Sequence, residues 1–290
     1  MLQACLTAAG EVVCPDGYEI MAAVADNDIH GSARGTCNRV QSLFPYRLHY
    51  VIEPERGLSS VRNRLLNEAV QLDADWLAFI DDDELPHKMW LVNFTRNIPA
   101  YSPDVLCGPL VQFNEGETPP APDELHVKRP TGSVPRHTAT NNVMFKAKLA
   151  AAQGLRFDPY FNFIGGEDFD FFSRSKALGN RHVWIAEAIV YEAVPPERTT
   201  NRYLFYRHFT GGINAVLRYR KTHNLLSTWA RYAPKVLGKL AGSLFYLIRG
   251  VLPSGGKHIK KSIKAVANTC GYLAGLMNIV VERYRKIDGN

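Results

Sequence analysis

Residues 76–84 read Trp-Leu-Ala-Phe-Ile-Asp-Asp-Asp-Glu, so five apolar residues run directly into four acids. An apolar run this short predicts a strand buried on both faces. Four acidic side chains at its end are costly to bury unless a cation offsets their charge. Hard oxygen ligands in this position suit Mg²⁺ or Mn²⁺ together with a phosphate-bearing ligand. The same residues also fit a solvated acidic turn, with Asp82 or Asp83 capping a helix that begins at Pro86.

The sequence before this stretch alternates between strand and helix patterns. Residues 18–25 and 46–51 are strand-like, and the first of these strands ends at Asp26-Asn27-Asp28. Gly57-Leu58-Ser59-Ser60 opens a helix over residues 61–71, with apolar residues at helical spacing. This alternation predicts an α/β fold with a mainly parallel sheet flanked by helices. Ligands of such sheets bind at the carboxyl ends of the strands, where the polar residues lie.

Charge is unevenly distributed along the 290 residues. Residues 201–290 hold 16 Lys and Arg but 2 Asp and Glu, a net charge of +14, whereas residues 1–200 carry a net charge of −8. We therefore expect a globular domain over 1–200 and a basic helical extension over 201–290. Basic residues alternating with aliphatic runs suit an anionic membrane surface better than nucleic acid, so no nucleic-acid partner is expected. The alternative is that these helices pack on the globular domain or on a second copy of it.

Two further features bear on membrane placement and compartment. Ala265–Val281 contains 17 uncharged residues, fewer than the ~20 that a membrane-spanning helix needs, which favours a helix lying in the interface. The five cysteines are scattered and odd in number, which argues against a disulfide framework and fits a reducing cytosol.

A second acidic cluster, Gly165-Gly166-Glu167-Asp168-Phe169-Asp170, opens another predicted helix. Asp168 there is a candidate general base. Acids in the first turn also stabilise a helix N-terminus, so the pattern alone does not decide between the two roles. Arg62 is a candidate for contacting a base or phosphate, and Asp26 for contacting a base or ribose. Considered singly, they also fit a surface helix residue and an Asx turn.

In chain order, four motifs resemble family 2 glycosyltransferases with a GT-A fold, in particular bacterial exopolysaccharide enzymes of the succinoglycan type. The motifs are Asp26-Asn27-Asp28, residues 55–63 (ERGLSSVRN), residues 79–84 (FIDDDE) and residues 165–170 (GGEDFD). The resemblance implies inverting transfer of a sugar from a nucleotide-sugar, most often a UDP-sugar, with Mn²⁺ or Mg²⁺. It also implies residue roles: nucleotide binding by Asp26, Arg62, Asn63 and Asp81; metal binding by the DxD pair Asp81 and Asp83; and catalysis by Asp168, with Glu167 as the alternative base.

This sequence departs from the family pattern in two places. Family members begin with a strand and a turn that grips the nucleotide, whereas the resemblance here starts at the first helix, so the sheet is expected to lack that strand. A late metal ligand, often a histidine, is replaced by Glu192, which could serve instead or could simply end a strand.

The resemblance and the charge pattern lead to two hypotheses about function. The first is a peripheral enzyme on the cytoplasmic face of the plasma membrane that extends a lipid-linked saccharide during exopolysaccharide or cell-surface glycan synthesis. The second is a catalytically inactive membrane-binding or scaffold protein that retains the fold. Sugar-nucleotide binding distinguishes the two.

Overall fold

The computed structural model describes residues 1–250 and 256–285, and the chain divides into two compact units. The α/β unit contains Met1–Asn162 and Glu167–Val194. The helical unit contains Pro195–Asn290 together with the four residues Phe163–Gly166, which come from the middle of the α/β sequence. The expected division into 1–200 and 201–290 remains a prediction, and residues 251–255 and 286–290 of that extension lie outside the described residues.

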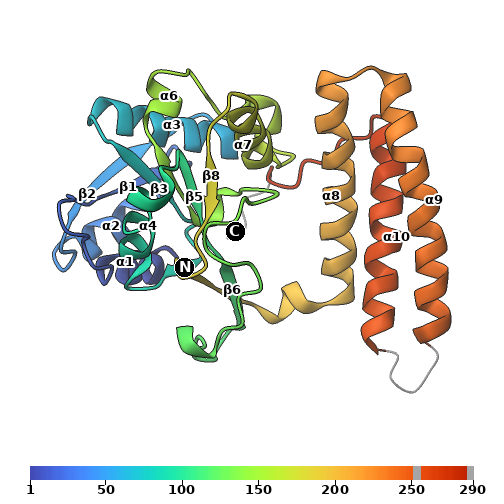
Figure 1. The fold of residues 1–290 in the computed structure, drawn as a ribbon, viewed down its shortest axis with the longest axis horizontal. Coiled ribbons are helices and arrows are strands. Elements are labelled where there is room, and N and C mark those ends of the chain that lie inside the picture. Colours follow the sequence, from blue (N-terminus) through green and yellow to red (C-terminus); the bar gives the residue numbers. More distant parts are fainter. Residues whose placement is uncertain (251–255, 286–290) are drawn as a thin grey trace. The chain divides into compact units, whose positions relative to one another are not determined.

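The α/β unit alternates helices and strands along most of its length (Figure 1). Its helices are α1 (Leu2–Gly10), α2 (Arg34–Gln41), α3 (Leu58–Gln71), α4 (Trp90–Thr95), α5 (Ile98–Tyr101), α6 (Lys148–Ala151) and α7 (Glu167–Ala177). Its strands are β1 (Met21–Asp26), β2 (Arg47–Ile52), β3 (Trp76–Phe79), β4 (Glu84–Pro86), β5 (Val105–Cys107), β6 (Leu110–Asn114), β7 (Val143–Lys146), β8 (His182–Trp184) and β9 (Val190–Val194). The α/β prediction is confirmed, with element ends shifted by a few residues.

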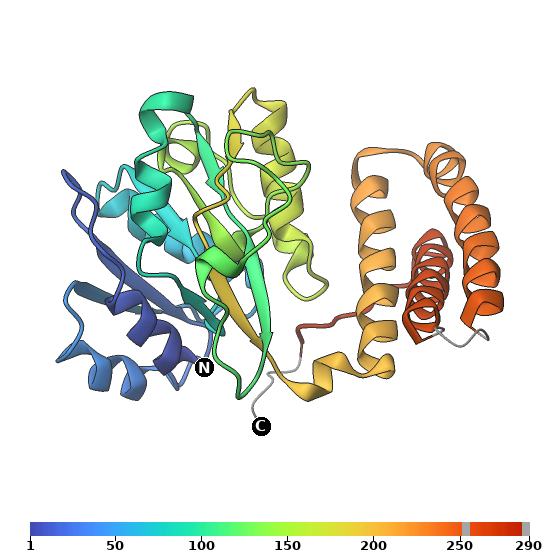
Figure 2. The same cartoon turned by 60° about the horizontal axis from the view of Figure 1, so that its bottom comes forward.

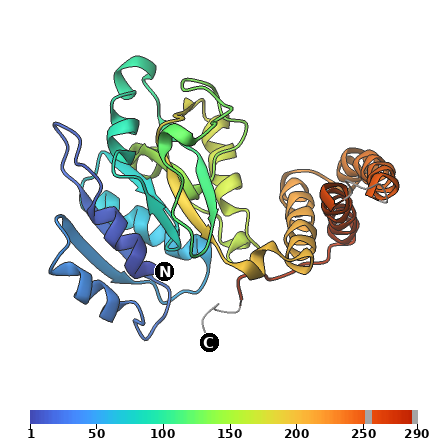
Figure 3. The same ribbon diagram turned by 90° about the horizontal axis from the view of Figure 1, so that it is seen from below.

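The strands form three hydrogen-bonded groups with mixed directions. β1 pairs with β2, the order β3-β7-β5-β8 forms a second group, and β4-β9-β6 forms a third. The pairs β1–β2, β5–β8 and β6–β9 are parallel, whereas β3–β7, β5–β7 and β4–β9 are antiparallel. The predicted parallel pairing is thus combined with antiparallel pairs, because β7 runs opposite to β3 and β5, and β4 runs opposite to β9. Apolar residues of α1 and α2 pack on β1 and β2, which lie beside these helices in Figure 3.

Two local predictions around residues 76–84 are wrong. β3 is not buried on both faces, because Leu77 and Phe79 are buried while Ala78 is exposed. No helix begins at Pro86, because residues 84–86 form strand β4 and pair antiparallel with β9. A proline is tolerated there since the strand is three residues long and lies at the edge of its group. The helix begins four residues later, at Trp90.

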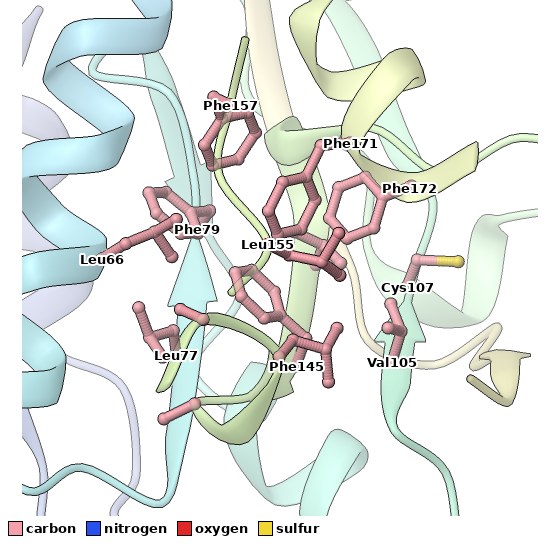
Figure 4. Close-up of a cluster of buried hydrophobic side chains, with 14 residues drawn as sticks. Leu66, Leu77, Phe79, Val105, Cys107, Phe145, Leu155, Phe157, Phe171 and Phe172 are labelled. Atoms are coloured by element: carbon pink, nitrogen blue, oxygen red, sulfur yellow. The ribbon is translucent and has the colours of Figure 1, made fainter. Parts of the chain in front are cut away.

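The main hydrophobic core joins the two helices that carry the candidate site residues. Figure 4 shows Leu66 of α3 and Phe171 and Phe172 of α7 pointing into one cluster with strand residues. Phe171 stacks on Phe157 at 4.3 Å between ring centroids. Aromatic contacts of this kind fix ring positions as well as burying apolar area. Helices α3 and α7 therefore pack into the same core.

The helical unit consists of α8 (Asn201–Thr222), α9 (Leu225–Gly250) and α10 (Gly256–Leu276), with α10 packed against both others. Figure 2 shows the three helices side by side. α8 and α10 approach closely at glycines: a Cβ on Gly271 would lie 2.2 Å from the carbonyl oxygen of Phe209. In the described parts of these helices, no segment is long and apolar enough to cross a membrane.

Candidate active site

The loop after β1 is organised by Asp26 and Asn27. The buried carboxylate of Asp26 accepts hydrogen bonds from the hydroxyl of Tyr50 (2.7 Å) and from the backbone N–H groups of Ala33 (2.8 Å) and Asp28 (3.0 Å). The Asn27 amide donates to the carbonyls of residues 53 and 55 and accepts from the N–H of residue 57. Asp26 thus makes the predicted Asx-type turn. Asn27, which sequence reasoning did not single out as a site residue, ties this turn to the start of α3.

The start of α3 is shaped by close packing against Asn162. Gly57 has φ +134°, and a Cβ there would lie 2.3 Å from the Asn162 side chain. Asn162 also accepts a hydrogen bond from the N–H of Ser60 (3.0 Å). Asn63, one helical turn on, donates to the carbonyl of Phe157 and accepts from its N–H, both at 2.8 Å. These contacts fix the helix end that carries Arg62. Asn162 was missed because its contacts join residues a hundred positions apart.

Arg62 joins two of the predicted motifs. Its guanidinium donates to the carboxylate of Glu167 and, at 3.3 Å, to Asp81. The Arg62 side chain is 12% exposed. Burial alone would lower the pKa of Arg62, but Glu167, Asp81 and Asp168 together raise it, so the guanidinium stays charged. The structure therefore brings the DxD segment and the acidic pair of α7 to one buried cation.

The acids of α7 have different surroundings. Glu167 is 3% exposed, and its pKa is raised by burial against the opposing effect of Arg62. Its Oε2 atom is buried and accepts no hydrogen bond within the described residues. Asp168 is partly exposed, and its Oδ1 accepts the N–H of Phe169 at 2.6 Å. Since an attacking hydroxyl must reach the base, this geometry favours Asp168 over Glu167.

The acids after β3 form a crowded cluster with β4 and β9. Buried Glu84 accepts the N–H of Asp81 at 2.7 Å and lies opposite Glu192 in the β4–β9 register. Burial, Asp81 and the neighbouring acids raise the pKa of Glu84 to about 10. The pKa of Asp81 is raised by its burial and by Asp83 and Asp168, with Arg62 acting against them. Glu84, the last acid of the motif, was not predicted as a site residue.

The donor set of this cluster fits a hard divalent cation. All of its side chains offer carboxylate oxygens, the ligands that Mg²⁺ and Mn²⁺ prefer. The raised pKa values of Asp81 and Glu84 reflect crowded negative charge, which a cation would offset. In residues 1–250 and 256–285, however, no three His, Cys, Asp or Glu side chains form a ready-made metal site. Glu192 instead accepts a hydrogen bond from Gln112 at 2.7 Å. Metal binding by Asp81, Asp83 and Glu192 remains a prediction.

With these acidic strand and helix ends at one buried arginine, the α/β unit is the domain of a nucleotide-sugar-dependent glycosyltransferase with a GT-A fold, as the family match and the solved structures below show. More specifically, the chain belongs to glycosyl transferase family 2, whose family model matches residues 2–161. This confirms the family prediction made from the four motifs. The matched range includes Arg62 and the DxD segment and ends before the acidic pair of α7.

Two curated proteins show where the sequence similarity lies. The succinoglycan biosynthesis protein ExoM of Rhizobium meliloti (strain 1021) is 29% identical over 280 residues, covering 93% of this chain and 87% of ExoM. Glycosyltransferase GlyA of Streptococcus pneumoniae serotype 4 is 27% identical over 100 residues, covering 34% of this chain and 14% of GlyA. Similarity to ExoM thus extends over nearly the whole chain, including the helical unit.

Solved structures show the same fold at low sequence identity. S. aureus TarS 1–349 in complex with UDP-GlcNAc has a TM-score of 0.55 at 13% identity, covering 99% of this chain and 91% of that chain. A longer TarS chain has a TM-score of 0.54, and the match spans 52% of its length. GalNAc-T7 with UDP, GalNAc and Mn²⁺ has a TM-score of 0.51 at 12% identity, covering 70% of this chain and 46% of that chain. These similarities confirm the GT-A fold.

Proposed function

We propose that this chain transfers a sugar, with inversion, from a UDP-sugar to a lipid-linked saccharide in exopolysaccharide or cell-surface glycan synthesis. The observation that carries the proposal is the bridge from Arg62 to Asp81 and Glu167, which gathers a strand end and a helix start at one point. The similarity to ExoM supports the exopolysaccharide role, and the UDP-GlcNAc complex of TarS supports the donor class.

We place the donor diphosphate beside Asp81 and Arg62, at the acidic edge, by which we mean the acids after β3 and at the start of α7. In this proposal Asp26 and Asn63 lie on the nucleotide side, with different roles. Asp26 accepts three hydrogen bonds, and a carboxylate has about four acceptor positions, which leaves room for one more. Both ends of the Asn63 amide are taken by Phe157, so its contribution would be to hold the helix that carries Arg62.

The transfer step follows from the position of Asp168. The acceptor oxygen forms a bond to the anomeric carbon while the bond from that carbon to the diphosphate oxygen breaks on the opposite face. The hydroxyl proton passes to Asp168, and the bonding electron pair leaves with the nucleoside diphosphate. Buried Glu167 keeps Arg62 fixed beside this point. A general base of this kind contributes about 10²–10⁴-fold to rate.

A divalent cation would be held by Asp83, with Asp81 and Glu192 as the other predicted ligands. When bound, it would supply Lewis-acid stabilisation of the charge on the leaving diphosphate. The Mn²⁺ named with GalNAc-T7, a protein of the same fold, supports this choice of metal class.

The test is nucleotide release by the full chain from UDP-sugars, with Mn²⁺ and membrane extracts rich in lipid-linked saccharides as acceptor. We expect acceptor-dependent release that is lost in Asp168→Asn. If neither transfer nor UDP binding is found, the catalytic proposal fails and the inactive scaffold is favoured. If transfer is found but persists in Asp168→Asn, the base assignment fails.

We further propose that the helical unit binds the anionic cytoplasmic face of the membrane, where nucleotide-sugars are available. One side of α9 exposes apolar residues at helical spacing, namely Leu226, Trp229, Leu237 and Leu240, with Leu226 80% exposed. α9 also carries Arg231, Lys235 and Lys239, spaced four residues apart on another side of the helix, where they lie over the rings of Tyr219, Tyr232 and Tyr272. An exposed apolar stripe on a helix of a strongly basic segment is typical of helices that lie in an anionic membrane interface.

A further inference from the structure

Phe163–Gly166, the segment that leads into the acidic pair of α7, belongs to the helical unit. Its upstream neighbour Asn162 is held by α3 in the α/β unit. The next residue downstream is Glu167, the first residue of α7. Whatever fixes these four residues therefore fixes the backbone from which Glu167 and Asp168 project.

Hydrogen bonds to two backbone carbonyls hold the segment within the helical unit. The Nδ2 of Asn214 on α8 donates to the carbonyl of Ile164. The N–H of Tyr284 donates to the carbonyl of Phe163 at 3.0 Å. Asn214 Oδ1 is buried and accepts no hydrogen bond from the described part of the chain. Because this amide is shielded from water, its nitrogen depends on the Ile164 carbonyl for a hydrogen bond, and losing that bond would leave a second polar group unpaired.

The two glycines allow this close approach. Gly165 and Gly166 have φ of +81° and +95°, a backbone region that favours glycine. A Cβ on Gly165 would lie 2.8 Å from the ring of Tyr284, and one on Gly166 would lie 2.7 Å from Nη1 of Arg218. The segment thus lies between α8 and the chain after α10, and its two glycine positions do not accommodate a side chain without strain.

We propose that Asn214 is a positioning residue for catalysis: α8 holds the Ile164 carbonyl and so sets the placement of Asp168 against the acceptor. This inference rests on the proposed function, because it takes Asp168 as the base. A small misplacement of a catalytic group costs up to about 10²-fold in rate without changing which ligands bind.

The experiment compares Asn214→Ala and Asn214→Asp with Asn268→Ala in the full chain. Asn214→Asp keeps the side-chain shape and removes the donor. Asn268 is a matched control, since its amide donates to the carbonyl of Lys264 on α10 and lies 3.3 Å from Nδ1 of His208 on α8, both outside the segment that leads into α7. For both Asn214 variants we expect kcat to fall about tenfold or more, with the donor KM within about twofold of wild type. Asn268→Ala should keep wild-type kcat.

The same changes are then made in the Asp168→Asn background. If Asn214 acts through the base, Asn214→Ala should have little further effect there, so the two losses are not additive. Fully additive losses, wild-type kcat in both Asn214 variants, or equal losses in Asn268→Ala would overturn the inference. Wild-type kcat in Asp168→Asn would overturn the base assignment itself, whereas a loss there without any effect of Asn214 would overturn only the inference.

Discussion

The acidic edge of the α/β unit and the exposed side of the helical unit use charge in opposite ways. At the acidic edge, charges are paired around a buried cation, as in the bridge from Arg62 to buried Glu167 and partly exposed Asp81. In the helical unit, α9 exposes cations such as Arg231 and Lys235 on one side and apolar side chains such as Leu226 and Leu237 on another. A cluster whose charges are paired around a buried cation suits chemistry on one ligand in a fixed position. A helix that exposes basic and apolar residues suits binding to a broad surface such as a membrane. The predictions below test this contrast.

The largest effect is expected at the acidic edge from Asp168→Asn. The variant keeps the side-chain volume and the acceptor for the N–H of Phe169 but cannot take the acceptor proton. We expect kcat to fall about 10²–10⁴-fold, measured by nucleotide release with saturating donor. UDP binding should be unchanged, since only the base is removed. A kcat within a few-fold of wild type would show that another group is the base.

Next in size is Arg62→Met, which tests whether the buried charges depend on one another. Removing the cation leaves Glu167 and Asp81 without their shared partner, and breaking a buried ion pair in this way costs about 3–5 kcal/mol. The measurement is the free energy of unfolding in urea.

Arg64→Met, on the same helix, is the control for Arg62. Arg64 pairs with Glu68 at a more exposed position, so its loss should cost less than about 1 kcal/mol. Equal losses in the two variants would contradict a special role for the Arg62 bridge.

Glu84→Gln tests the crowding of negative charge through pH. The pKa of Glu84 is raised to about 10 in the folded protein, above its value in the unfolded chain. Its favourable contribution is therefore fully present below the unfolded pKa and is lost as pH rises towards 10. Glutamine keeps the acceptor for the N–H of Asp81 and has no charge to bury. Unfolding measured from pH 5 to 9 should show a smaller loss of stability in the variant, and parallel curves would contradict the assignment.

The smallest effect is expected from Leu226→Asp in the helical unit. Adding a charge to the apolar stripe of α9 should weaken binding to vesicles of anionic lipid about tenfold and leave transfer to a soluble acceptor unchanged. Leu43→Asp provides the control, because Leu43 is 87% exposed and lies in the α/β unit. Equal binding by both variants and wild type would remove the stripe from the membrane proposal.

The sequence predicted the elements that follow a local pattern and missed those that depend on distant partners. Helix α3 and the acids after β3 were predicted because apolar spacing and a run of four carboxylates are local features. Strand β4 was missed, because Glu84-Leu85-Pro86 becomes a strand only by pairing with residues 190–192. The exposure of Ala78 likewise depends on what packs against β3, which the strand's own sequence does not record.

The candidate site was predicted as a set of residues but not as a network. Motif order placed Arg62, Asp81 and Glu167 at one edge, yet no spacing rule indicated that the arginine would join both acids. Asn27 and Asn162 were missed because they bind backbone atoms of distant loops. An isolated asparagine in a sequence gives no indication of which loop it will hold.

The most direct test of the account is the thermal unfolding of the full chain with UDP, GDP and dTDP, each with and without Mn²⁺, repeated on Asp83→Ala. A ligand at 100 times its Kd stabilises a fold by about 2.7 kcal/mol, which shifts the unfolding temperature measurably. We predict that UDP raises the unfolding temperature only in the presence of Mn²⁺, and that this shift is lost in Asp83→Ala. No shift with any nucleotide, or the same shift in the variant without metal, would contradict the claim that the acidic edge binds a nucleoside diphosphate through a cation.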